Sequence, residues 1–94
     1  MPFAIYCRDK PGHAAVRAEN RAAHLEYIDR FADRVIIAGP LLDETGTGMI
    51  GSLLLMDFAS RAEAEAFAAG DPYAKAGLFE SVAIMPWKQV RPQA

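Results

Sequence analysis

The sequence predicts a single α+β domain in which two helices cover one face of a four-stranded antiparallel sheet. Its 94 residues are too few for two domains, and a hydrophobic content of 52% is that of a folded globular chain. Four short runs rich in β-branched and aromatic residues are interleaved with two segments of helical spacing. The second and third runs are joined directly by a loop, which is typical of an antiparallel hairpin. The expected order is therefore βαββαβ over residues 1–94, the ferredoxin-like arrangement.

The first half of the chain supplies two strands and the longer helix. Aromatic and β-branched residues at 3–8 end at the turn sequence Asp9-Lys10-Pro11-Gly12 and predict the first strand. Residues 13–32 have the spacing of an amphipathic helix, with an apolar stripe formed by Ala18, Ala22, Leu25, Ile28 and Ala32. The β-branched run at 35–40 is too short for a helix and predicts the second strand, which ends at Gly39-Pro40.

The second half of the chain repeats the pattern. A polar loop at 41–48 leads into the longest expected strand, at 49–58. Ser60 and Glu63 have the spacing of a capping box, so a second helix begins there and continues to about residue 69. Only a weak core-facing side is expected for this helix, formed by Ala62, Ala66, Phe67 and Ala69, and the alanines favour the helix itself. The last strand is expected at 79–88, and residues 91–94 form a tail.

The strands are apolar on both faces of the predicted sheet. In the third strand Leu53 and Leu55 point to one face, while Leu54 and Met56 point to the other. A half-solvated antiparallel sheet would alternate polar and apolar residues, and two helices cover only one face. We therefore expect a homodimer in which a second copy covers the open sheet face, with the two sheets packed together or closed into a barrel-like unit.

Composition excludes several classes of partner. The formal net charge is -2 with both signs scattered, so the basic surface that a nucleic acid requires is missing. No run approaches the roughly 20 apolar residues that span a bilayer, and the N-terminus does not resemble a signal peptide. The single cysteine, Cys7, cannot form an internal disulfide, so a cytoplasmic protein is expected.

The segment 70–77, Gly-Asp-Pro-Tyr-Ala-Lys-Ala-Gly, forms a corner between the second helix and the last strand. Pro72 pushes Asp71 out of the helical region, so its carboxylate lies on an extended, stiffened backbone. His24 lies on the flank of the first helix, beside the expected apolar stripe. In this topology the first helix and the corner can meet, so we expect a His24/Asp71 pair that tunes the imidazole for proton transfer. Taken separately, His24 is compatible with a structural histidine and Asp71 with a turn residue.

Other residues are candidates for ligand binding. Arg17 and Arg21 share the helix flank with His24 and are able to bind an anionic substrate, although solvent-exposed arginines paired with acids are an equal alternative. Ser52 and Tyr73 are candidates for hydrogen bonding inside a pocket.

Neither a cofactor nor a metal is expected. Residues 46–51 match the letters of the dinucleotide pattern G-x-G-x-x-G, but they lead into a strand rather than a helix, and the interpretation is rejected. His13 and His24 have no Cys, Asp or Glu at a recognised ligand spacing.

Several segments resemble the YCII-related family of small bacterial proteins of the dimeric α/β-barrel kind. They are Arg21-Ala22-Ala23-His24-Leu25, Ala38-Gly39-Pro40, Gly51-Ser52, the run from Asp71 to Glu80 and Pro86-Trp87-Lys88. The resemblance implies a ferredoxin-like homodimer with a His-Asp active site that maps onto His24 and Asp71. Members without an assigned substrate predominate, and a few resemble dehydrochlorinases that act on chlorinated hydroxyquinols.

We therefore expect a small enzyme without a cofactor, in which His24 and Asp71 carry out acid/base chemistry of a dehydrochlorinase, lyase or isomerase type on a small cyclic or aromatic substrate. The alternative is a non-catalytic ligand-binding or interaction module in which the same pair anchors a corner. An enzyme requires a solvent-reachable cavity at His24, whereas the alternative predicts an imidazole surrounded by side chains.

Overall fold

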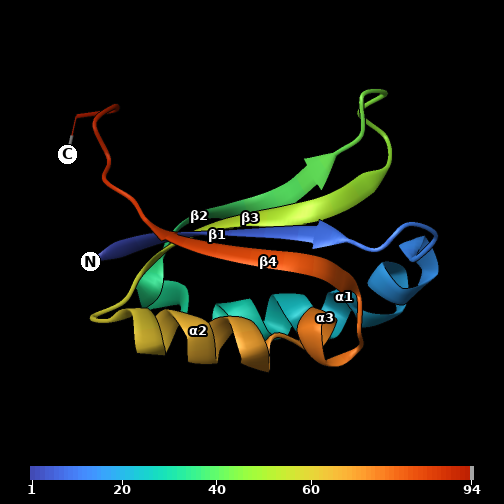
Figure 1. The fold of residues 1–94 in the computed structure, drawn as a ribbon, viewed down its shortest axis with the longest axis horizontal. Coiled ribbons are helices and arrows are strands. Elements are labelled where there is room, and N and C mark those ends of the chain that lie inside the picture. The colour runs from blue at the N-terminus through green and yellow to red at the C-terminus, as the bar shows by residue number, and fades with distance from the viewer. Residues whose placement is uncertain (94) are drawn as a thin grey trace.

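The computed structural model describes residues 1–93 and has the expected order of elements. The strands and helices are β1 (Pro2–Asp9), α1 (Ala14–Asp29), β2 (Val35–Leu42), β3 (Met49–Asp57), α2 (Arg61–Gly70), α3 (Pro72–Lys75) and β4 (Phe79–Pro86). The four strands form one antiparallel sheet in the order β2-β3-β1-β4. Figure 1 shows all three helices on one face of this sheet, which confirms the ferredoxin-like α+β fold.

The core lies between the sheet and the helices. Alternate residues of β1 face the helices, and Ile5 pairs with Leu54 of β3 and Ile84 of β4 to form a row across the sheet. Behind this row an aromatic cluster joins the helices to β3, with Phe67 stacked against Tyr27 at 5.4 Å between ring centroids. Each fully buried large apolar side chain contributes about 1.5–3 kcal/mol. The buried residues that form this core cluster are Phe3, Ile5, Cys7, Leu54, Met56, Phe58, Ala64 and Phe67.

The face that α1 turns to the sheet differs from the one expected. Leu25, at the centre of the predicted apolar stripe, is 43% exposed, whereas Arg17 and His24 are buried. The alanines of the stripe bury little area, so their position does not determine how the helix docks. Arg17 and His24 are buried in place of the alanines because each has a carboxylate partner, Asp9 at the sheet and Asp71 at the corner.

Several boundaries also differ from the prediction. The first helix ends at Asp29, and a separate 3-10 turn, Ala32–Arg34, precedes β2. The last strand ends at Pro86 rather than at residue 88. In α2 the buried residues are Ala64 and Phe67, whereas Ala62, Ala66 and Ala69 are exposed. Helix α3 was not expected, because a single turn has no periodic pattern to detect.

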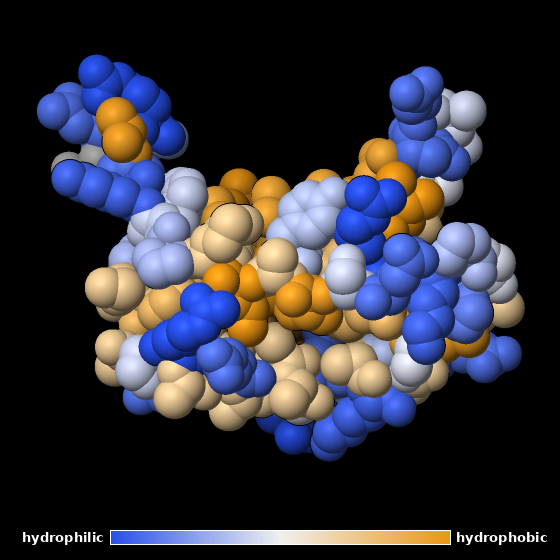
Figure 2. Space-filling view, in the orientation of Figure 1, coloured by the Kyte–Doolittle hydropathy of each residue, from blue (hydrophilic) through white to orange (hydrophobic). Residues whose placement is uncertain are grey.

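The second face of the sheet is not covered by any described residue. Ile37 is 62% exposed, Met85 51% and Leu53 37%, although all are apolar. In Figure 2 apolar residues line the upper edge between two hydrophilic projections, which are the β2–β3 loop and the C-terminal tail of Figure 1. No described helix is long and apolar enough to cross a membrane.

Candidate active site

The corner that carries Asp71 is built by the junction of two helices. Asp71 has φ -60° and ψ 128°, so α2 stops there, and Pro72 begins α3 with the fixed φ that a first helical turn needs. The Asp71 carboxylate caps α3 by accepting a hydrogen bond from the Tyr73 amide at 2.9 Å. Gly77, at φ 73°, then reverses the chain into β4 in a conformation that favours glycine. The extended backbone predicted for Asp71 is therefore present, and its carboxylate is fixed by a cap.

His24 reaches the same carboxylate from α1. Its Nδ1 lies 2.9 Å from Oδ1 and 3.1 Å from Oδ2 of Asp71, and both side chains are buried. Since an ionised carboxylate only accepts hydrogen bonds, Nδ1 carries the proton and donates it. In the neutral ring this leaves Nε2 as the acceptor, and Nε2 has no hydrogen-bond partner among residues 1–93.

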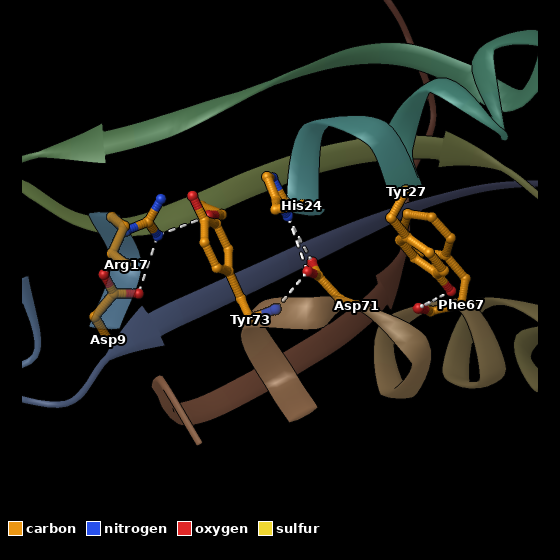
Figure 3. Close-up of polar contacts among 8 residues, drawn as sticks. Asp9, Arg17, His24, Tyr27, Phe67, Asp71 and Tyr73 are labelled. Atoms are coloured by element: carbon orange, nitrogen blue, oxygen red, sulfur yellow. Dashed lines mark hydrogen bonds and ion pairs between the residues drawn. The ribbon is translucent and has the colours of Figure 1, made fainter. Parts of the chain in front are cut away.

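The Tyr73 ring separates the two polar residues that α1 buries. Arg17 and His24 are seven residues apart, and in Figure 3 the Tyr73 ring lies between them. The ring stacks on the His24 imidazole at 4.0 Å and 13°, and the Arg17 Cζ lies 4.6 Å from the ring centroid. One aromatic ring thus packs against both an imidazole and a guanidinium, and its contact with the guanidinium stabilises that cation.

Arg17 is held by a residue that the sequence analysis assigned to a turn. Its Nε and Nη2 donate to the two oxygens of Asp9, at 2.7 and 3.0 Å. Nη2 also donates to Ser52 Oγ at 2.9 Å. Asp9 is buried because strand alternation puts it on the same face as Cys7. That alternation, together with an arginine eight residues later on the facing helix, is the signal that could have identified Asp9.

Burial and neighbouring charges together shift the pKa values of three titrating groups in this region. Burial raises the pKa of Tyr73, and the positive charges of Arg17 and Arg21 partly offset this effect. Burial would lower the pKa of Arg17, but the hydrogen bond and charge of Asp9 outweigh it and raise that pKa. Burial, followed by the charges of Asp71 and Asp9, raises the pKa of the Cys7 thiol to about 12, so Cys7 is an inert core residue.

A cavity of about 250 Å³ lies between α1 and the edge of the sheet formed by β2 and β3. Its polar wall contains Arg17, Arg21, His24 and Ser52, and its apolar wall contains Leu25, Ile28, Val35, Ala38, Pro40, Met49 and Leu54. Arg21 makes no ion pair or side-chain hydrogen bond within residues 1–93. Because Asp9 compensates Arg17, Arg21 carries the unbalanced positive charge at this cavity.

The fold brings the predicted residues together in two layers. His24, Arg17, Arg21 and Ser52 line the cavity, whereas Asp71 and Tyr73 lie behind its wall and contact His24. His13 lies elsewhere, and its Nδ1 is 2.9 Å from the carbonyl oxygen of Pro11. Among residues 1–93 no three His, Cys, Asp or Glu side chains cluster as metal ligands would.

The fold and this site define the class of dimeric α/β-barrel proteins, which are ferredoxin-like domains with a cavity between helices and sheet. The chain belongs to the YCII-related domain family, which it matches over residues 1–88. Protein YciI of Escherichia coli is 35% identical over 96% of this chain and 99% of that protein. An uncharacterized protein of Haemophilus influenzae is 31% identical over the same shares.

Solved structures agree with this assignment. The 5-chloro-2-hydroxyhydroquinone dehydrochlorinase of Burkholderia phenoliruptrix AC1100, in complex with 2,5-dihydroxybenzoquinone, is 41% identical, with a TM-score of 0.89 and 94% of each chain covered. Protein Atu4242 of Agrobacterium tumefaciens is 20% identical, with a TM-score of 0.54 over 100% of each chain, and it shares the fold. The chain is therefore a member of the YCII-related family that is similar to an enzyme acting on a small molecule.

Proposed function

We propose that this protein is an enzyme in which His24 transfers a proton to and from a small ring compound bound in the cavity, without a cofactor. The observation that carries the proposal is the orientation of the imidazole: Nδ1 is committed to Asp71, and the residue lines the cavity. A buried histidine that only anchored the corner would be surrounded by side chains. The opening beside His24 therefore favours chemistry over a purely structural role.

The cavity is suited to one ring with a negatively charged or acidic oxygen. Its volume of about 250 Å³ lies below the usual range for drug-sized ligands, and most of its lining is apolar. Arg21 supplies a cation at the wall, and we assign the contact with an anionic group to Arg21 because Arg17 is already compensated by Asp9. The 2,5-dihydroxybenzoquinone bound by the dehydrochlorinase of Burkholderia phenoliruptrix is a compound of this kind.

The expected proton transfer follows from the tautomer. Nε2 accepts the proton of an acidic O–H or C–H group, and the imidazolium that forms is stabilised by the Asp71 carboxylate. The stacked Tyr73 ring fixes the plane of the imidazole. In an isomerisation the same Nε2–H returns the proton to another atom of the ligand. In a dehydrochlorination the C–Cl bond breaks, chloride leaves with the bonding electrons, and the proton passes from Nε2 to water. Asp71 and Tyr73 therefore act through His24, and His24 is the catalytic residue.

Isotope exchange tests this proposal without knowledge of the natural substrate. The ring hydrogens of 2,5-dihydroxybenzoquinone exchange with D₂O when a proton is added to the ring carbon and the original one is removed. We expect the protein to accelerate this exchange, measured by proton NMR, and His24→Gln to reduce the acceleration at least 100-fold, the usual contribution of a general acid-base group. Asp71→Asn, which leaves His24 in place, is expected to have a smaller effect.

The control separates an enzyme from a binding module. Probe affinity is measured in parallel by calorimetry for the same variants, and Glu19→Gln on the exposed side of α1 serves as the matched substitution. Binding of the probe without accelerated exchange by the wild type would favour the non-catalytic module. Equal exchange rates for wild type and His24→Gln would exclude His24 as the acid-base group.

We also propose that the protein is a cytoplasmic homodimer joined through the open sheet face. The proposal is supported by the exposed apolar residues of that face, Ile37, Leu53 and Met85, which a second copy would bury. Leu53→Asp is expected to give a monomer in analytical ultracentrifugation, whereas Ala62→Glu on the exposed side of α2 leaves a dimer. A wild-type monomer at micromolar concentration would contradict this assembly.

A further inference from the structure

The Asp9–Arg17 pair determines whether the Ser52 hydroxyl donates or accepts a hydrogen bond in the cavity. Ser52 Oγ accepts a hydrogen bond from Arg17 Nη2, and guanidinium groups only donate. The hydroxyl proton must therefore point elsewhere, and it has no acceptor among residues 1–93. Ser52 is only 3% exposed and lines the cavity. Because Ser52 borders the cavity, an acceptor for this proton lies inside the cavity, where water or a ligand oxygen supplies it.

The position of Arg17 is fixed from the side opposite Ser52. Both oxygens of Asp9 hold the guanidinium in a two-pronged contact, and the Tyr73 ring packs against it at 4.6 Å from Cζ to the centroid. Since Asp9 also neutralises the charge, Arg17 has little tendency to leave for an anion in the cavity. The pair thus holds the serine oxygen in place and occupies one of its two acceptor sites.

We propose that Ser52 is a dedicated hydrogen-bond donor to a carbonyl or enolate oxygen of the ligand, and that Asp9 and Arg17 are the positioning residues that give it this polarity. The inference rests on the proposed function, because it concerns the same cavity. It makes Asp9 part of the site, although Asp9 does not line the cavity.

The donor role narrows the class of substrate. The cavity presents one acceptor, His24 Nε2, and one neutral donor, the Ser52 hydroxyl, beside the cation of Arg21. A ring that carries both an acidic hydrogen and a carbonyl or enolate oxygen satisfies all three groups. A ring with only hydrocarbon or halogen substituents leaves the serine proton without a partner, and it is expected to bind weakly.

A double-mutant cycle tests the inference. The ligand is 2,5-dihydroxybenzoquinone, and its dissociation constant is measured by calorimetry. Ser52→Ala is expected to weaken binding about tenfold, the usual effect of losing a hydrogen bond to a charged acceptor. The unclamped variant, Asp9→Leu with Arg17→Met, removes both charges together, keeps the net charge and retains apolar volume at both positions. It is expected to weaken binding about threefold, because the hydroxyl is then free to rotate, and to have no further effect in the Ser52→Ala background.

The cycle distinguishes this inference from a structural effect and from the proposed function. If the threefold loss of probe affinity persists in the Ser52→Ala background, Asp9 and Arg17 affect the cavity without acting through Ser52. That result overturns their positioning role. Unchanged affinity in Ser52→Ala overturns the donor role by itself. If the unclamped variant does not fold, Arg17→Lys replaces it, since an ammonium group cannot span Asp9 and Ser52 in the same fork. Wild-type protein that fails to bind the probe contradicts the proposed function, and the donor role falls with it.

Discussion

At the scale of residues, the site consists of a buried ion pair, Asp9–Arg17, and a buried hydrogen bond, His24–Asp71, separated by one aromatic ring. Arg17 and His24 lie about 10 Å apart along α1, because each of the seven residue steps from one to the other adds about 1.5 Å. The Tyr73 ring fills this gap, with Asp9 at the arginine and Asp71 at the histidine. Among residues 1–93 no buried side-chain nitrogen or oxygen lacks a hydrogen-bond partner. The geometry is therefore strongly determined, since each buried charge needs its own partner.

Asp71 performs two tasks, and substitutions can separate them. Its carboxylate accepts a hydrogen bond from the Tyr73 amide as the cap of α3, and it orients His24. Asn retains an oxygen for the cap, whereas Ala does not. We expect Asp71→Ala to be about 1 kcal/mol less stable than Asp71→Asn in urea unfolding, the usual value of a helix cap. Equal stability of the two variants would mean that the cap contributes nothing to the fold.

At the scale of elements, the backbone of α2 lies against Tyr27 of α1 at Gly70. A Cβ at this position would meet the Tyr27 hydroxyl, which donates a hydrogen bond to the Phe67 carbonyl at 2.8 Å. Gly70 has no positive φ, so it is needed for this close approach rather than for backbone freedom. The contact fixes α2, and through it the Asp71 corner, against the first helix.

This close approach predicts an unusual glycine substitution. In an exposed helix Gly→Ala stabilises by about 0.5–1 kcal/mol. Gly70→Ala is instead expected to destabilise the protein by about 1–3 kcal/mol in urea unfolding, because the new methyl group displaces the Tyr27 hydroxyl. In a Tyr27→Phe background, where that oxygen is absent, most of the loss is expected to disappear. A similar loss in both backgrounds would contradict the steric explanation.

The elements with clear local signals were predictable from the sequence. The capping box at Ser60 predicted the start of α2, and Ser60 does accept a hydrogen bond from the Glu63 amide at 3.3 Å. The predicted end of the second strand at Gly39-Pro40 is wrong, because β2 continues through both residues to Leu42. The proximity of His24 and Asp71 followed from the βαββαβ topology. The sheet-facing side of α1 was not predictable from its apolar residues, because it is determined by the partners of Arg17 and His24, which lie in other elements of the chain. Asp9 was missed for the same reason, since its turn-like neighbours concealed its place on the buried face of β1.

At the scale of the whole molecule, stability is expected to fall at alkaline pH. Folding raises the pKa of Cys7 from 9.0 to about 12, so between these values the native state holds a proton that the unfolded chain has released. The free energy of unfolding therefore decreases as pH rises above about 9, by up to about 1.4 kcal/mol per pH unit for this group. Tyr27 and Tyr73, whose pKa values are raised by burial, add to the decrease above their ordinary value of 10.0.

Denaturant unfolding between pH 8 and pH 11 measures this decrease. The Cys7→Ala variant is expected to be less stable at pH 8, because a core side chain is shortened, but to lose less stability between pH 9 and pH 10. Identical pH profiles for wild type and Cys7→Ala would show that the thiol does not govern this range.

The central claim is that Asp71 fixes the imidazole of His24 so that Nε2 faces the bound ligand. Nitrogen-15 NMR of labelled histidine measures this directly, because protonated and unprotonated ring nitrogens have well-separated chemical shifts. When the His24 imidazole is neutral, we expect its Nδ1 to be protonated and its Nε2 to be unprotonated. Binding of 2,5-dihydroxybenzoquinone is expected to shift the Nε2 resonance while Nδ1 stays protonated. A His24 ring protonated on Nε2, or an Nε2 resonance that saturating probe does not move, would contradict the account.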